Sequence, residues 1–206
     1  SIKDTRHAFV LNEDILNYKA EVGDHAFDVM GAFSYQQSVT KTLSASGSGY
    51  ISDVSGTYDV GAAETPNTPS SSYTQWVLMS WLGRFNYIFK DKYMFTVSMR
   101  ADGSSRYSEG QRWGYFPSAA FAWNAKNESF LEDKDAISAL KVRLSYGQTG
   151  QQDVGGLYDA LPTYYNNTLG SYYPFGGYTD GSGLVYPIKP VGYNADLKWE
   201  TTTTYN

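Results

Sequence analysis

Strict alternation of apolar and polar residues is the most regular feature of this sequence. From Leu16 to Val22 every second residue is apolar, and after the break at Gly23-Asp24 a second alternating run extends from Phe27 to Gln36. A period of two is typical of β-strands with one face buried, and a short polar break between two such runs indicates a tight turn. The two runs therefore predict a β-hairpin.

The same alternation recurs along the rest of the chain. We predict further strands over Tyr73–Lys90, Tyr93–Arg100, Pro117–Asn127, Leu140–Tyr146 and in a run that begins near Asp196. In the first of these, Trp76, Leu78 and Leu82 fall out of phase, which predicts either a β-bulge or a packed inner face at that point. About seven strands joined by turns predict an all-β, antiparallel fold.

The connections between the strands alternate in length. The long ones are 38–72, 101–116 and 147–195, and the short ones are 23–24, 90–92 and a helical or turn-like connection over 128–139. A transmembrane β-barrel has short turns on its periplasmic side and long loops outside. The pattern therefore predicts a segment of an antiparallel transmembrane β-barrel with long extracellular loops and short periplasmic turns.

Aromatic and charged side chains separate onto opposite faces of these strands. Tyr87, Phe89 and Tyr93 flank one short turn on the apolar face, and Trp123 lies near the next. Amphipathic rings settle at the level of the lipid headgroups, so this placement is typical of an interfacial girdle. The opposite face, expected to line a wet lumen, carries Lys19, Glu21, Asp28, Arg100, Lys141 and Arg143.

Composition narrows the function classes. The chain has 206 residues, 17% aromatic and 18% charged, with a formal net charge of −5, two His and no Cys. This excludes a disordered chain, a disulfide scaffold and thiol catalysis, and an acidic balance without a basic run argues against nucleic acid. The sequence has no nucleophile elbow, phosphate-binding loop or zinc-protease motif. We expect no catalytic residue, no metal and no cofactor.

A soluble fold is the alternative from another class. Alternating strands with aromatic pairs also build secreted carbohydrate-binding β-sandwiches. An odd set of strands, however, leaves two unpaired edges, whereas bacterial single-chain barrels have even numbers of strands and no free edge. We therefore expect residues 1–206 to be part of a longer barrel domain whose remaining strands lie outside this chain.

A series of short motifs runs through most of residues 80–206. The residues that carry it are Arg84, Asn86, Tyr87, Lys92, Tyr93, Arg100, Asp102, Gly103, Ser104, Ser105, Arg106, Phe116, Pro117, Lys141, Arg143, Tyr146, Gly147, Trp199 and Glu200. In order and spacing they resemble the barrel region of the SusC/RagA family of TonB-linked outer-membrane proteins. Tyr107, where a Phe is common, and Gln151, where an Asn is usual, are mild departures from the family pattern.

The resemblance implies a plugged barrel of roughly 22 strands that imports oligosaccharides or peptides across the outer membrane of Bacteroidetes. It implies a SusD-like surface lipoprotein as a lid and the TonB–ExbB–ExbD complex as an energy source, reached through parts outside this chain, with outer-membrane lipid around the barrel and no nucleic acid. A siderophore or cobalamin receptor and a passive porin are the alternatives within the same fold.

The motif residues are expected to act structurally. Asp102 to Arg106 reads as a turn that staples the loop 101–116, with Arg106 paired to Asp102 or to a neighbouring loop. Phe116-Pro117 marks the start of a strand, because Pro is tolerated at a first strand position. Arg84, Arg100 and Arg143 are expected to form charge networks in the lumen with carboxylates such as Asp28 or Glu200.

Tyrosines recur through the longest connection, 147–195, from Tyr158 to Tyr193. The candidate ligand contacts are Tyr164, Tyr165, Tyr172, Tyr173, Phe175 and Tyr178. Aromatic faces stack on the C–H faces of sugars, and Tyr offers a large contact area at low entropic cost, so this segment suits a glycan or the face of a protein lid. The same rings are equally suited to packing the loop against its neighbours.

Overall fold

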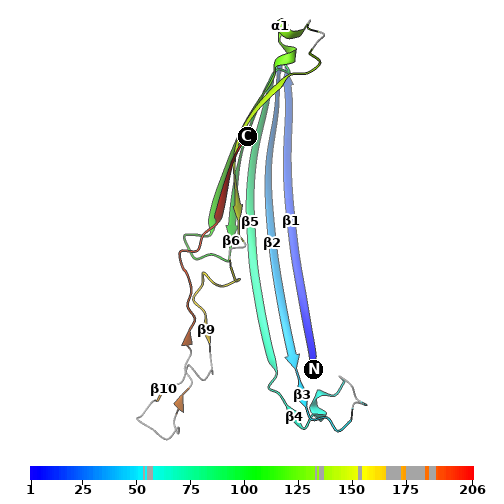
Figure 1. Ribbon diagram of the computed structural model, residues 1–206, viewed down its shortest axis with the longest axis vertical. Helices are drawn as coiled ribbons and strands as arrows, with labels where there is room; N and C mark the ends of the chain where they lie inside the picture. The colour runs from blue at the N-terminus through cyan, green and yellow to red at the C-terminus, as the bar shows by residue number, and fades with distance from the viewer. Residues whose placement is uncertain are drawn as a thin grey trace.

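The structure is a computed structural model that describes residues 1–52, 54, 58–132, 134, 137–152, 155–165, 173–174, 184–185 and 189–206. One antiparallel sheet dominates it, with seven strands in the order β1-β2-β5-β6-β7-β8-β13. Their bounds are β1 Ile2–Val22, β2 His25–Ala45, β5 Ser70–Phe89, β6 Tyr93–Ser104, β7 Trp113–Asn124, β8 Lys141–Gln151 and β13 Glu200–Tyr205. Each strand pairs with its neighbours in sequence, so the sheet is a curved up-and-down meander (Figure 1).

The remaining elements are short and lie in the connections. They are η1 Val60–Ala62, η2 Ala125–Asn127, α1 Ser129–Glu132 and three two-residue pairs: β3 Gly47–Ser48 with β4 Thr65–Pro66, β9 Tyr164–Tyr165 with β12 Lys189–Pro190, and β10 Tyr173–Pro174 with β11 Leu184–Val185. The turn-like connection predicted after β7 is confirmed by η2 and α1.

The connections alternate between the two ends of the sheet. Those at 23–24, 90–92 and 125–140 lie at one end with α1, and those at 46–69, 105–112 and 152–199 lie at the other (Figure 1). We call these the turn end and the loop end. The predicted sorting by length is wrong at one point, since 125–140 is longer than 105–112; the sorting by side holds throughout.

Several strand boundaries differ from the prediction, mostly at the loop end. β1 begins at Ile2 and β2 continues to Ala45, so the tract 38–72 is a connection only over 46–69. Its first residues alternate Ser and Thr with Val39, Lys41, Leu43 and Ala45, so the prediction ended the strand too early: the period of two continues, interrupted only at Lys41. The ladder is nevertheless complete, from Val22↔His25 to Ile2↔Ala45.

Two motifs also move from loop to strand. Asp102, Gly103 and Ser104 lie within β6, so the predicted turn is confined to Ser105 and Arg106, where Arg106 N–H donates to Ser104 Oγ. Pro117 lies inside β7, opposite Met99, and does not start the strand. Pro has no N–H to donate, and the β7–β8 ladder accordingly begins one residue later, at Ser118.

The bounds of the last two strands of the sheet also differ from the prediction. β8 continues beyond Tyr146 to Gln151, and β13 begins only at Glu200, so Leu197 and Trp199 precede the strand. No bulge lies in β5, because its ladders with β2 and β6 run without a break in register. The alternative prediction, a packed inner face, is the correct one: Leu78 is buried.

Cross-strand partners lie on the same face of a sheet, so the register defines two faces. One row across five strands, which defines the aromatic face, is Phe27↔Tyr87↔Phe95↔Phe121↔Leu144. The adjacent row, which defines the polar face, is Lys19↔Asp28↔Asn86↔Thr96↔Ala120↔Ser145. The predicted separation of apolar and charged residues onto opposite faces is confirmed.

The main side-chain core sits where the sheet changes height. β6 pairs with β5 only as far as Leu78↔Ser104, while β5 continues to Ser70. Leu78, Tyr107, Phe116 and Trp199 form a buried cluster at this step, and Trp76 and Leu197 pack against it. The Trp199 ring lies 5.5 Å from both the Tyr107 and Phe116 rings, between centroids. We call this group the step cluster.

Gly150 makes room for the step cluster, and it generates a first prediction. A Cβ at Gly150 would overlap the Phe116 ring, whereas a Cβ at Gly147 would meet Ser118 Cβ at an ordinary 3.6 Å. We expect Gly150→Ala to destabilise the full-length protein by about 1–3 kcal/mol, because overpacking shifts buried rings. Gly147→Ala is the matched control and should leave stability unchanged. The measurement is the temperature at which the detergent-solubilised protein loses its resistance to SDS; equal values for both variants would contradict the packing described.

Candidate functional site

The aromatic face carries an apolar band between two rows of rings. Its large side chains are exposed: Leu16 is 77% and Leu144 61% accessible. The row at the turn end comprises His25, Phe27, Tyr87, Phe89, Tyr93 and Trp123, and the row toward the loop end comprises Phe33, Tyr35, Trp81, Tyr115 and Trp113. Between them the face carries Val29, Gly31, Gly83, Val97 and Ala119, together with the rings of Tyr18, Phe85 and Tyr146 in the row of Val29.

The height of this band matches a bilayer. Along β2 the two rows are separated by the ten steps from His25 to Tyr35. At about 3.3 Å per residue and a tilt of about 40°, this length corresponds to roughly 25 Å of membrane thickness. On β1 the second row is already polar, because Asn12 and Asp14 lie opposite Tyr35 and Phe33, and beyond this row the same face carries Gln37 and then Lys41 opposite Arg6. An apolar band of this height between two aromatic girdles is typical of the lipid-facing surface of a transmembrane barrel wall.

Glu128 gathers the polar atoms of the girdle at the turn end. Tyr93 Oη donates to Glu128 Oε1 over 2.6 Å, Trp123 Nε1 donates to the same oxygen over 3.2 Å, and Lys92 Nζ reaches Oε2 at 3.1 Å. The Glu128 side chain is only 15% exposed. These hydrogen bonds, Tyr93 first, then Lys92 and Trp123, hold the pKa of the Glu128 carboxyl below its usual value. The contacts explain why Lys92 and Tyr93 recur as a motif: they fix the rings at the membrane boundary.

The polar face carries an ion pair near the middle of the sheet. Arg100 Nε donates to both carboxylate oxygens of Asp102 at 2.8 Å, and Arg100 Nη2 lies 3.4 Å from Ser80 Oγ. Asp102 and Ser80 are buried. Arg100 thus forms the expected ion pair with a carboxylate of this face, but the partner is Asp102 and not Asp28 or Glu200; Asp28 faces Lys19, at 3.6 Å.

The other motif arginines also depart from the expected networks. Arg84 Nη2 lies 3.4 Å from Met30 Sδ, and in the part of the chain that the structure describes neither Arg84 nor Arg143 forms an ion pair. Arg106 does not pair with Asp102, because Arg100 already occupies that carboxylate. Arg106 Nη2 donates to Gly155 O at 2.8 Å, so the alternative of a contact with a neighbouring loop is confirmed.

Both ends of the longest connection, 152–199, are fixed to the sheet at the step cluster. Tyr107 Oη donates to Gln152 O at 3.1 Å, and Ser108 Oγ donates to Ala160 O at 2.6 Å. At the far end, Trp199 Nε1 donates to Arg112 O at 2.9 Å. We call the segments 155–163 and 191–199 the loop base.

Tyr158 joins the loop base directly to the wall. The backbone N–H of Gln75 donates to Tyr158 Oη at 2.8 Å, and Tyr158 Oη donates to the Gln75 carbonyl at 3.2 Å. For this tyrosine the packing interpretation is correct. Sequence reasoning missed the role, because nothing in the local pattern pairs residues 83 positions apart.

The candidate ligand tyrosines divide into two groups. Tyr164 lies in β9 with 57% of its surface exposed, and Tyr165 and Tyr173 lie in β9 and β10, with their side chains outside the described part. Tyr172, Phe175 and Tyr178 fall outside the described residues altogether. A role in ligand contact therefore stays a prediction for all six.

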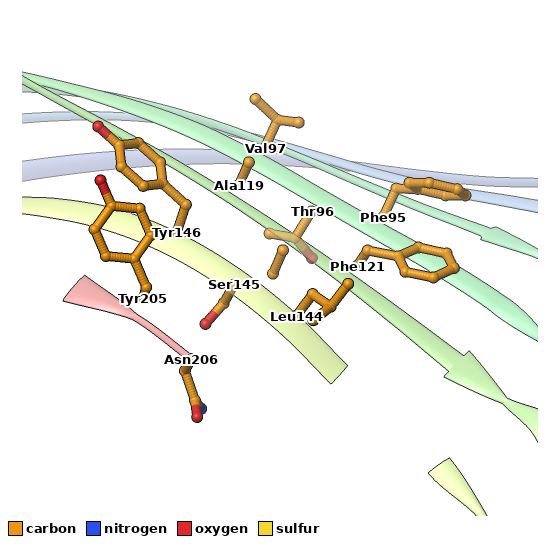
Figure 2. A pocket seen from close by; sticks show the side chains of 11 residues that line it. Phe95, Thr96, Val97, Ala119, Phe121, Leu144, Ser145, Tyr146, Tyr205 and Asn206 are labelled. Atoms are coloured by element: carbon orange, nitrogen blue, oxygen red, sulfur yellow. The ribbon is translucent and has the colours of Figure 1, made fainter. Parts of the chain in front are cut away.

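A hollow of about 630 Å³ lies on the aromatic face near β13. Figure 2 shows the Tyr146 and Tyr205 rings together on one side and Phe95 and Phe121 on the other, with Ala119 nearby. The lining contains no charged side chain, so the hollow suits an apolar chain, such as a lipid tail, rather than a polar substrate.

Among the described residues, no three His, Cys, Asp or Glu side chains gather in a way that could hold a metal ion. Within the same residues, no helix is long and apolar enough to cross a membrane.

Comparison with curated proteins finds TonB-dependent receptors. The chain is 36% identical over 203 residues to the TonB-dependent receptor SusC of Bacteroides thetaiotaomicron, which covers 98% of this chain and 19% of the relative. It is 32% identical over 201 residues to the TonB-dependent receptor P26 of Formosa agariphila, covering 94% of this chain and 19% of that protein. The chain thus spans about a fifth of the length of these relatives. No protein-family model matches it.

Comparison with solved structures finds the same type of sheet. The structure of the RagAB peptide transporter matches with a TM-score of 0.79 at 22% identity, over 98% of this chain and 21% of the other. The RagAB peptide importer in its 'open-open' state matches with a TM-score of 0.80, also at 22% identity and over the same shares. At this identity the likeness concerns the fold.

The Glu128 contacts generate a prediction of pH dependence. A carboxyl whose pKa is lowered in the folded state stabilises that state above the pKa of the unfolded chain, and the contribution disappears as the pH falls through the folded pKa. We expect Glu128→Gln to lower the thermal midpoint of the full-length protein at neutral pH, and the two midpoints to converge in acid, below the usual Glu range. Asp24→Asn, which removes an exposed partner of Lys90 at 3.7 Å, is the control and should change little. Equal midpoints of wild type and Glu128→Gln at neutral pH would refute the role of the network.

Proposed function

This chain belongs to the SusC/RagA family of TonB-dependent receptors, and from that premise we propose that it forms part of the barrel wall and of the extracellular loops of an outer-membrane importer. The observation that carries the proposal is the two-sided sheet: an apolar band between two aromatic rows on one face, a polar face behind it, and the longest connection at a single end. The loop end is then extracellular and the turn end periplasmic. Residues 1–206 would be one part of the barrel domain.

The whole protein would import its substrate actively. The relatives named above are TonB-dependent receptors, and the structural matches are titled as a peptide transporter and importer. We propose that the substrate is an oligosaccharide or a peptide, that a SusD-like surface lipoprotein covers the loop end, and that the TonB–ExbB–ExbD complex supplies energy through parts of the protein outside this chain. A siderophore or cobalamin receptor is the less favoured candidate, because this chain is 36% identical in sequence to the receptor SusC.

A soluble carbohydrate-binding β-sandwich is disfavoured by the exposure of the aromatic face. A sandwich buries one face of each sheet against the other. Here side chains as large as Leu16, Trp81 and Leu144 are exposed. In water such a surface would aggregate, whereas in a bilayer it is solvated by acyl chains.

Import by living cells tests the proposed function. Cells expressing the full-length receptor with its neighbouring lipoprotein should accumulate fluorescent oligosaccharides or peptides, and accumulation should stop when a protonophore removes the energy source. Without the lipoprotein we expect reduced uptake at low substrate concentration. Uptake that persists in de-energised cells would indicate a passive pore and contradict the proposal.

We also propose that the distal part of the longest connection contacts the substrate or the lid, through Tyr164, Tyr165, Tyr172, Tyr173, Phe175 and Tyr178. The support is its position beyond an anchored base at the extracellular end. Replacing Tyr172 and Tyr173 together by Ala should weaken substrate capture by about tenfold, the loss expected for one or two aromatic contacts. Tyr58→Ala, a fully exposed tyrosine in the connection 46–69, is the control. An unchanged half-saturation concentration for uptake in the double variant would remove these two residues from the ligand site.

A further inference from the structure

The polar face changes its chemistry halfway along the long strands. Toward the turn end its positions carry the charged residues Lys19, Glu21, Asp28, Arg84 and Arg100. Toward the loop end the polar-face positions between Thr5 and Leu11, Gln36 and Ser44, and Ser70 and Leu78 carry no Asp, Glu, Lys or Arg; all three stretches are described. These rows of the wall are therefore uncharged, and the nearest charged residues of the same face on β1 are Glu13 toward the turn end and Lys3 at the start of the strand.

Two aromatic side chains stand in these uncharged rows. Phe9 on β1 and Trp76 on β5 share a row with Ser38 of β2, which lies between them. Their ring centroids are 6.4 Å apart, with the planes inclined at 55°. Phe9 is 51% exposed although it faces the inside of the wall, and Trp76 is half-buried because it packs on the step cluster. We call this pair the aromatic platform.

Neutral hydrogen-bonding groups surround the platform. His7 Nε2 lies 2.9 Å from Ser38 Oγ, which is buried beneath the two rings. The next row toward the loop end places Thr40 and Thr74 beside His7, and the row toward the turn end places Gln36 between Leu11 and Leu78. An exposed apolar surface is thus bordered on both sides by hydroxyl, amide and imidazole groups without a formal carboxylate or ammonium.

This combination fits the chemistry of a neutral sugar. A pyranose ring has an apolar face of C–H groups that stacks on an aromatic ring, and a rim of hydroxyls that exchange hydrogen bonds with neutral side chains. A mixed peptide carries charges, and burying a charge without a partner is costly. We infer that Phe9 and Trp76 form a subsite on the extracellular wall that stacks one sugar ring of a neutral oligosaccharide, with His7 and Gln36 as polar neighbours.

The inference rests on the proposed function only in that the polar face must line the transport path. Of the two proposed substrate classes it favours the oligosaccharide over the peptide. It also assigns this preference to residues of β1 and β5. These residues belong to strands of the wall and not to the longest connection, so the subsite is a different set of residues from the tyrosine candidates named above.

The experiment uses the full-length receptor purified in detergent and measures binding by calorimetry. The probes are neutral hexasaccharides of glucose, of mannose and of xylose, an acidic oligosaccharide of galacturonic acid, and a mixture of short peptides. The wild type should bind a neutral probe. Trp76→Ala should raise the dissociation constant for it about tenfold, and Trp76→Phe should keep it within about threefold, because a ring face is retained.

Phe9→Ala separates the subsite from the packing of the step cluster, since Phe9 contacts Trp76 but is not part of that cluster. This substitution should weaken binding of the neutral probe while leaving the thermal stability of the receptor unchanged. Val10→Ala is the matched control, a truncation one residue along β1 that points to the opposite face, and it should have no effect on binding.

The outcomes distinguish this inference from the proposed function. If cells take up substrate in an energy-dependent manner but Trp76→Ala and Phe9→Ala bind the neutral probe as the wild type does, the subsite is wrong and the importer stands. Binding only to the acidic or peptide probes, or to none, also overturns the subsite. Absence of energised uptake of any probe, by contrast, contradicts the importer itself.

Discussion

Main-chain hydrogen bonding in register is the interaction on which the rest of this structure depends. The seven strands form one layer, and the described residues bury few side chains apart from the step cluster. In a bilayer no water is available to backbone N–H and C=O groups, so a paired ladder is strongly favoured there even without a core on either side. The ladder also decides function, because a slip of one residue would exchange the aromatic face for the polar face.

Side-chain networks appear where this constraint relaxes, at the two ends of the membrane band. At the turn end, Glu128 holds the polar atoms of Tyr93 and Trp123 and so fixes the depth of the girdle. At the loop end, the ladder between β5 and β6 stops at Leu78, and the step cluster packs into the corner that this leaves. Four motif residues belong to these sites: Lys92 and Tyr93 contact Glu128, and Phe116 and Trp199 form part of the step cluster.

The sequence predicted the membrane band well and the extracellular parts poorly, for a physical reason. Inside the band one face must be apolar, so strands such as Tyr93–Arg100 can be recognised in the sequence by a period of two. Outside it the ladder persists with polar residues on both faces, as between Lys3 and His7, and no period marks it. Contacts between distant segments were equally hidden: the turn chemistry of Asp102 pointed to Arg106, whereas the strand geometry places Arg100 two positions away on the same face.

Tyr158 covers the edge of β5 where this strand continues beyond the end of its ladder with β6. A bare strand edge invites pairing with other chains, and on β5 one phenol satisfies both main-chain groups of Gln75 in place of a missing strand. Because the seal is made at the root of the longest connection, residues 164–190 beyond it can change in length and composition without opening the wall. A receptor built this way can acquire new cargo by altering its outer segment alone, while the scaffold beneath stays intact.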